Sequence, residues 1–165
     1  MKKVFSILIS LLLITVTEFA QTSANKKPQV LIFISAKCPC IYSHQETFKA
    51  CINAYKDKID FITIFIDKND DTEEIQDMLK NLGWKVKYVV DKQKFYTKTY
   101  HPKATTDCVF VSASGEILYK GAVDDSPLNM GQVLNFYVKD AIEDFLNHKP
   151  VKVKEGKSFG CTIVI

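Results

Sequence analysis

The sequence predicts an α/β fold in which helices cover both faces of a mixed central sheet, an α/β/α three-layer sandwich. Two apolar, β-branched runs of strand length, at residues 29–35 and 59–66, are each followed by apolar residues at helical spacing. Two further apolar runs, at residues 108–112 and 116–120, flank a turn-sized gap and predict a β-hairpin. Parallel strands followed by an antiparallel hairpin are typical of a layered α/β domain.

The first 24 residues precede this domain. Two lysines are followed by a run over residues 4–16 that is almost wholly apolar, and then by a polar stretch that ends near Ala20 or Ala24. This order is typical of a secretory signal peptide, here residues 1–24 with cleavage near 20–24. A single membrane anchor is the alternative, and it is disfavoured because the apolar run is short for a span. We therefore expect a periplasmic or secreted protein with no stable membrane span after cleavage.

The composition fits one exported domain. The chain has 165 residues, 47% of them hydrophobic, so residues 25–148 can form one globular domain with an ample core. Residues 149–165 form a tail, and its apolar end predicts that it docks on the domain. The net charge of +3 is close to neutral and gives no argument for nucleic-acid binding. Five cysteines in an exported chain can form disulfides, and an odd number leaves at least one thiol over.

Each predicted helix has its own start or stop signal. Pro39 opens a helix over residues 40–56, because proline at the first helical position loses no hydrogen bond. Asp71 is the expected N-cap of the next helix, with Glu74 completing a capping box and Gly83 ending the helix. The remaining expected elements are a short extended segment at 86–90, a brief helix at 93–101 and a long amphipathic helix at 133–148.

Two cysteines lie where the first strand passes into its helix. Pro39 keeps Cys38 out of the α region, and Cys40 follows in the first turn. The unpaired N–H groups and positive dipole end of a helix N-terminus favour thiolate over thiol, and Lys37 adds a positive charge nearby. Because the thiolate is the reactive form of cysteine, the Cys-Pro-Cys sequence predicts a redox site.

The chain resembles the thioredoxin superfamily, and more closely the redoxin-type thioredoxin-like proteins that bacteria export. The resemblance covers nearly all of the chain after the signal peptide. It rests on the strand–Cys-Pro–helix unit followed, in family order, by segments 104–111, 121–125, 137–142 and 159–161. It implies a thioredoxin-like fold and thiol–disulfide exchange without a cofactor. The implied partners are protein thiols or disulfides and a membrane or periplasmic reductase.

The resemblance aligns Cys38 with the nucleophile of the thioredoxin motif. The usual partner lies three residues on, where this chain has Ile41, so Cys40 is expected to resolve the mixed disulfide instead. A Cys-Pro-Cys ring would be tight, and strain makes a disulfide more oxidising. Cys161 in the tail motif and Cys108 at the hairpin strand are further candidates for resolving or accessory thiols. The alternative is a set of free thiols in an inert relic of the site.

The loop before the hairpin departs from the family. Redoxin-type relatives carry Thr-Pro-Glu here, with a cis-proline facing the reactive cysteine, whereas this chain has Thr106, Asp107 and Cys108. A cis bond without proline costs about 2.5–4 kcal/mol, so we expect a trans loop at these active-site positions. The departure keeps open a third possibility, a catalytically silent thioredoxin-like interaction domain.

Two other chemistries fit parts of the same sequence. His44 lies one helical turn after Cys40, so Cys38, Cys40 and His44 together offer two sulfurs and an imidazole, ligands suited to Cu(I) or Zn. The alternative for His44 is an exposed helix histidine. Peroxiredoxins, which are related to redoxins, use a threonine three residues before the reactive cysteine and an arginine elsewhere in the chain. This chain has Ser35 in place of the threonine and contains no arginine, so peroxidase activity is disfavoured.

Overall fold

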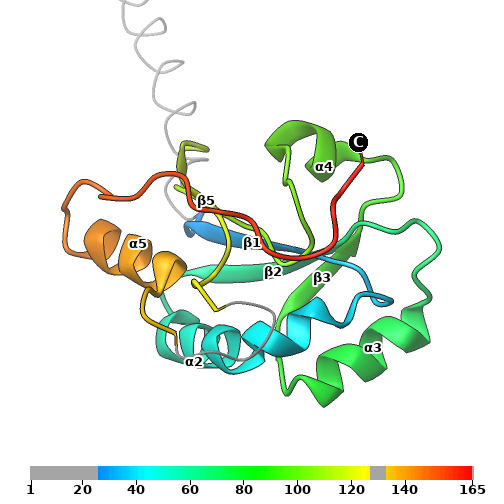
Figure 1. Cartoon of the computed structure of the whole chain (residues 1–165). Coiled ribbons are helices and arrows are strands. Elements are labelled where there is room, and N and C mark those ends of the chain that lie inside the picture. Colours follow the sequence, from blue (N-terminus) through cyan, green and yellow to red (C-terminus); the bar gives the residue numbers. More distant parts are fainter. Residues whose placement is uncertain (1–25, 127–132, 165) are drawn as a thin grey trace, which may run out of the picture.

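The computed structural model describes residues 26–126 and 133–164, so the predicted signal peptide lies outside the described residues. The described chain forms a five-stranded sheet in the order β3-β2-β1-β4-β5, with helices on both faces (Figure 1). The elements, in chain order, are β1 (Gln29–Ile34), η1 (Pro39–His44), α2 (Gln45–Tyr55), β2 (Asp60–Phe65), α3 (Thr72–Asn81), β3 (Lys87–Val90), α4 (Phe95–Tyr100), β4 (Cys108–Val111), β5 (Ile117–Gly121) and α5 (Tyr137–Leu146). The predicted mixed sheet between helical layers is confirmed.

Strand β1 is the centre of the sheet. It pairs in parallel with β2, which pairs in parallel with β3, and it pairs antiparallel with β4 on its other side. At Ile32 the register places Thr63 of β2 on one side and Cys108 of β4 on the other. Both faces of β1 are covered, which explains its continuous apolar sequence. Its carboxyl end, where Cys38 follows, therefore emerges from the middle of the sheet.

Alternate residues of β1 enter two separate cores. Ile32 lies in the larger core, which α2, α3 and α5 close from one face. Phe33 lies in the smaller core on the opposite face, beneath α4 and the C-terminal tail. The side chains that close this smaller core from outside are Tyr96, Tyr100 and Ile163. The tail thus occupies part of one outer layer of the sandwich.

Two predicted helices differ from the observed ones. The helix predicted over 40–56 begins as the 3-10 helix η1 and becomes α-helical only at Gln45. The helix predicted over 133–148 starts too early in the sequence: the observed helix α5 begins at Tyr137. The Asp125 carboxylate accepts the N–H groups of Leu134 and Asn135, which holds these residues in a loop. None of the helices in the described residues is long and apolar enough to cross a membrane.

The tail after α5 runs back across the molecule rather than away from it (Figure 1). Its backbone bonds to Lys120 at the end of β5, accepting one hydrogen bond at Lys154 and donating one from Gly156. Gly156 lies so close to Gly121 that a Cβ on Gly121 would meet the Gly156 backbone at 2.9 Å. Position 121 therefore requires glycine if the tail is to pass, and a Cβ on Gly156 would collide with the Tyr119 hydroxyl. The tail then continues toward the carboxyl end of β1.

Candidate functional site

Cys38 lies in the turn between β1 and η1. Its backbone is extended, with φ −99° and ψ 117°, and Pro39 follows as the first residue of η1. The N–H of Cys38 donates to the carbonyl oxygen of Ser35 at 3.1 Å, which closes the turn. The Cys38 side chain makes no capping bond to the helix and is 7% exposed. Its sulfur faces the Thr105 hydroxyl and the Cys161 sulfur.

The segment before β4 faces this turn. The N–H of Phe33 donates to the Asp107 carbonyl oxygen at 2.9 Å, and the N–H of Thr106 donates to the Phe33 carbonyl oxygen at 2.7 Å. These bonds extend the pairing of β1 with β4 beyond the strands. The described residues contain no cis peptide bond, and Thr106 has a positive φ of 78°. The trans loop expected in the absence of proline is therefore present.

The side chain of Asp107 holds this loop from within. Its Oδ2 accepts the N–H groups of Lys103 at 2.7 Å and Ala104 at 3.1 Å. It also accepts the hydroxyl of Ser158 from the tail at 2.9 Å. Burial raises the pKa of the Asp107 carboxyl above its usual range, and these donors oppose the rise. One buried carboxylate thus joins the loop and the tail.

The tail pairs with this loop and brings Cys161 to the site. The N–H of Thr105 donates to the Cys161 carbonyl oxygen at 2.8 Å, and the N–H of Ile163 donates to the Lys103 carbonyl oxygen at 3.0 Å. The N–H of Cys161 also donates to the Thr105 hydroxyl at 3.0 Å. At Gly160, with φ +135°, a Cβ would collide with the Thr105 carbonyl oxygen. The glycine before Cys161 is therefore required for this close approach.

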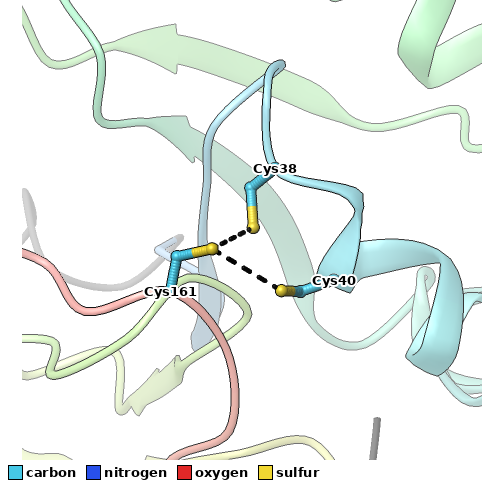
Figure 2. A group of neighbouring side chains, drawn as sticks. All are labelled: Cys38, Cys40 and Cys161. Carbon is cyan, nitrogen blue, oxygen red and sulfur yellow. Dashed lines mark hydrogen bonds between the residues drawn. The ribbon is translucent and has the colours of Figure 1, made fainter. Parts of the chain in front are cut away.

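Three cysteine sulfurs meet at the resulting junction (Figure 2). The Sγ of Cys38 lies 3.0 Å from the Sγ of Cys161, and the Sγ of Cys40 lies 3.8 Å from the same atom. All three sulfurs lie within 4.8 Å of one another. Two of them come from the start of η1 and the third from the tail, on the other side of the cluster.

The surroundings of Cys38 and Cys40 separate their acidities. Burial raises the pKa of Cys38, but hydrogen bonds from the Thr105 hydroxyl, the Cys161 thiol and the Cys40 backbone outweigh it and bring the pKa to about 7. The Thr105 hydroxyl lies 3.1 Å from the Cys38 sulfur. Burial and the neighbouring sulfurs raise the pKa of Cys40 to about 12. Of these two thiols, Cys38 is therefore the one that ionises near neutral pH.

A groove of about 570 Å³ leads to the cluster. Cys38 and Cys161 lie in its wall, whereas Cys40 does not line it. The other lining residues are Ser35, Lys37, Ile66, Asp67, Lys68, Asp91, Lys92, Lys94, Thr97, Thr105, Thr162, Ile163 and Val164. An incoming disulfide or thiol can thus reach the Cys38 sulfur from solvent.

Three residues that the sequence singled out lie in other surroundings. The Lys37 ammonium pairs with the Asp67 carboxylate at 3.9 Å, so this carboxylate offsets part of its charge. His44 is buried, and its Nδ1 lies 2.6 Å from Oδ1 of Asp124, so it is not the exposed helix histidine of the sequence interpretation. It also lies outside the sulfur cluster. Cys108 is fully buried, which raises the pKa of its thiol well above the usual value.

Thr105 is a residue of the site that sequence reasoning did not find. It lies one position before the expected loop residues Thr106 and Asp107, and its hydroxyl touches Cys38 from 67 positions away. One threonine of a Thr-Thr pair belongs to no periodic pattern and to no motif with a defined spacing. Only its place in the loop that faces the cysteine turn could have suggested it.

No protein-family model matches the chain, and no curated protein is similar to it in sequence. Solved structures are similar in fold. A hypothetical protein of Sinorhizobium meliloti is similar with a TM-score of 0.75 and 21% identity, over 86% of this chain and 81% of that one. An uncharacterized conserved protein of Geobacillus kaustophilus is similar with a TM-score of 0.75 and 24% identity, over 85% and 78%.

The thioredoxin domain of a thiol-disulfide oxidoreductase from Bacteroides vulgatus is also similar in structure. Its TM-score is 0.58 and its identity 17%, over 74% of this chain and 81% of that one. The thioredoxin-like fold that the resemblance implied is therefore confirmed.

Proposed function

We propose that this protein is an exported thiol–disulfide oxidoreductase that exchanges disulfides with protein thiols through Cys38 and Cys161. The observation that carries the proposal is the 3.0 Å separation of the two sulfurs at the end of an open groove. The fold supports the reaction class, since the thiol-disulfide oxidoreductase of Bacteroides vulgatus has a domain of the same fold. The reaction needs no cofactor, because both electrons come from the two thiols.

The exchange has two steps. The Cys38 thiolate attacks one sulfur of a substrate disulfide, forms a mixed disulfide and releases the other substrate sulfur as a thiolate, which takes up a proton. Cys161 then loses its proton and attacks the Cys38 sulfur, which forms the Cys38–Cys161 disulfide and releases the second substrate thiol. The substrate gains two electrons and two protons, which the two cysteines lose. A reductase thiol pair reverses the change and restores the protein.

Cys161 is better placed than Cys40 to resolve the mixed disulfide. Closing a bond from 3.0 Å to the usual length of about 2.0 Å needs a shift of about 1 Å in an exposed tail residue. A bond between Cys38 and Cys40 would instead close a ring across Pro39 at the rigid start of η1. The raised pKa of Cys40, about 12, also makes it a poor attacking and leaving group. We therefore assign Cys161 the resolving role that the sequence interpretation gave first to Cys40.

Reduction of insulin disulfides by dithiothreitol, in the presence of a metal chelator, tests the proposal. The wild-type protein should accelerate reduction, and Cys38→Ser should abolish the acceleration. In a separate incubation of reduced protein with insulin and no dithiothreitol, Cys161→Ser should leave Cys38 trapped as a mixed disulfide with insulin, which mass spectrometry detects. Cys51→Ala is the matched control, because it removes a thiol buried on α2, and it should retain the activity.

Disulfide mapping of the oxidised protein provides the second readout. We expect a peptide pair linking Cys38 to Cys161. A dominant Cys38–Cys40 link would overturn the assignment of the resolving thiol. A wild-type protein that accelerates no disulfide reduction would overturn the oxidoreductase itself and favour a silent interaction domain.

The place of the reaction rests on the predicted signal peptide. We propose that residues 1–24 direct the chain to the periplasm or the exterior, where protein disulfides form. Fractionation of expressing bacteria should recover a shortened chain outside the cytoplasm. N-terminal sequencing of that chain should give a start between residues 21 and 25. A full-length chain in the cytoplasm would contradict export.

A further inference from the structure

We propose that the reduced protein binds one Cu(I) ion through the sulfurs of Cys38, Cys40 and Cys161. In the part of the chain that the structure describes, these are the residues whose ligand atoms gather closely enough to share an ion, all within 4.8 Å of one another. Two come from the start of η1 and one from the tail, so the site exists only while the tail is docked (Figure 2). This inference does not depend on the proposed oxidoreductase activity.

The spacing of the sulfurs is close to that of ligands on one ion. Three thiolates about 2.3 Å from one ion in a trigonal plane lie about 4.0 Å apart. Cys40 and Cys161 come close to this separation, at 3.8 Å between their sulfurs. Cys38 and Cys161, at 3.0 Å, are closer than two ligands would be, so Cys161 must move outward by about 1 Å. Cys161 is exposed, which leaves space for this movement.

The ligand set favours Cu(I) over Zn(II). Thiolates suit both Cu(I) and zinc, but a structural zinc site is completed by a fourth protein ligand. The described residues supply no fourth cysteine, histidine or carboxylate to this cluster. His44, which the sequence offered as the third ligand, is buried against Asp124 instead. Three sulfurs without a nitrogen or oxygen partner therefore match a monovalent soft ion.

Metal binding and disulfide exchange would exclude each other at this cluster. Binding requires the thiols to release their protons to solvent as the sulfurs bind the ion, with no change in the oxidation state of sulfur or copper. A Cys38–Cys161 disulfide would remove two of the three ligands. Cys40 belongs to the metal site but not to the proposed exchange pair. It therefore separates the two activities experimentally.

Anaerobic titration of the reduced, full-length protein with Cu(I), in competition with bicinchoninate, tests the site. We expect one Cu(I) per chain, and X-ray absorption should show a copper coordinated by three sulfurs. Cys40→Ser and Cys161→Ser should each weaken binding by at least about tenfold, since even partners of metal ligands contribute that much. Cys51→Ala, which removes a remote buried thiol, should bind as the wild type does. Circular dichroism should show that each variant is folded.

Several results would overturn the site. Unchanged affinity in folded Cys40→Ser or Cys161→Ser would remove that residue from the ligands. Equal weakening in Cys51→Ala would show that copper binds any thiol of the chain. Tighter binding of Zn(II) than of Cu(I) would contradict the choice of ion. Loss of copper binding in folded Cys40→Ser, with unchanged binding in Cys51→Ala, supports the site, whereas copper binding by a wild-type protein that reduces no insulin overturns only the oxidoreductase proposal.

Discussion

Thr105 and Cys161 hold each other by two hydrogen bonds. The N–H of Thr105 donates to the Cys161 carbonyl oxygen at 2.8 Å, and the N–H of Cys161 donates to the Thr105 hydroxyl at 3.0 Å. Because that hydroxyl oxygen accepts from Cys161, its own proton can be directed to the Cys38 sulfur, 3.1 Å away. A single threonine therefore positions one sulfur and lowers the pKa of the other.

The reactivity of Cys38 should follow a pKa of about 7. The alkylation rate of Cys38 in metal-free reduced protein should rise with pH around that value, whereas an ordinary thiol titrates near 9. Because the pKa of Cys38 is lower in the folded than in the unfolded protein, ionisation of Cys38 raises the free energy of unfolding. The reduced protein should therefore gain stability over Cys38→Ser as pH rises from about 7 toward 9. Iodoacetamide kinetics read by mass spectrometry provide the test, and a midpoint near 9 would contradict it.

Thr105→Val should raise the pKa of Cys38. The change removes the hydroxyl that donates to the sulfur while keeping a similar volume. One net hydrogen bond of about 0.5–1.5 kcal/mol corresponds to a pKa rise of about 1. Thr105→Ser keeps the hydroxyl and is the matched control, with a pKa close to that of the wild type. The same alkylation series measures both variants, and equal pKa values in Val and Ser variants would show that the hydroxyl plays no part.

Gly160→Ala should release Cys161 from the cluster. Its Cβ would collide with the Thr105 carbonyl oxygen, so the tail must move away. Misplacing a reacting group by about 1 Å can cost on the order of 10²-fold in rate, and we expect a loss of that size in insulin reduction. Gly115→Ala is the control, because that glycine also has a positive φ, of 92°, but nothing lies within 4 Å of a Cβ there. Equal activity in the two variants would contradict tail docking as a requirement.

Asp107→Ala should destabilise the protein by roughly 1.5–3 kcal/mol, the range for hydrogen bonds to a charged group. The buried carboxylate accepts from Lys103, Ala104 and Ser158, and without it the loop loses all three bonds. Ser158→Ala removes only one of the three bonds and should therefore cost less than Asp107→Ala. Urea unfolding measures both free energies. Equal losses would mean that the tail contact alone accounts for the contribution of Asp107.

Asp124→Ala should destabilise the protein by about 1–3 kcal/mol, because it leaves the buried Nδ1 of His44 without its hydrogen-bond partner. Asp124→Asn keeps an acceptor for His44 and should lose less. Burial opposes ionisation of Asp124, but the bond from His44 and its other donors outweigh it and lower the pKa of the carboxyl. Because the pKa of Asp124 is lower in the folded protein than its unfolded value of 3.8, the carboxylate contributes stability above pH 3.8. That contribution is lost as the pH falls through the pKa of the folded state. The advantage of the wild type over Asp124→Asn in urea unfolding should therefore shrink below about pH 4, and a constant difference would contradict it.

The sequence by itself determined the sheet and the position of Cys38 at the turn into the first helix. The apolar runs of β1 and β2 mark strands covered on both faces, and Cys38 followed by Pro39 marks the turn into a helix. Such features depend on neighbours a few residues away, through side-chain periodicity and the fixed φ of proline. The start of α5 was misplaced because Asp125 bonds the residues before it, a contact without periodicity.

Only the tertiary structure decided which groups meet Cys38. Cys161 lies 123 positions away and Thr105 lies 67 away, and they arrive through backbone pairing between the tail and the loop before β4. His44 stands one turn from Cys40 in the sequence, yet it bonds Asp124, 80 positions away, because the 3-10 geometry of η1 turns it into the core. The local sequence encodes which faces of a strand or helix are buried, because this depends on the periodicity of apolar residues. Pairing between distant backbone segments depends instead on close contacts, such as that of Gly160 with Thr105, which produce no periodic pattern in the sequence.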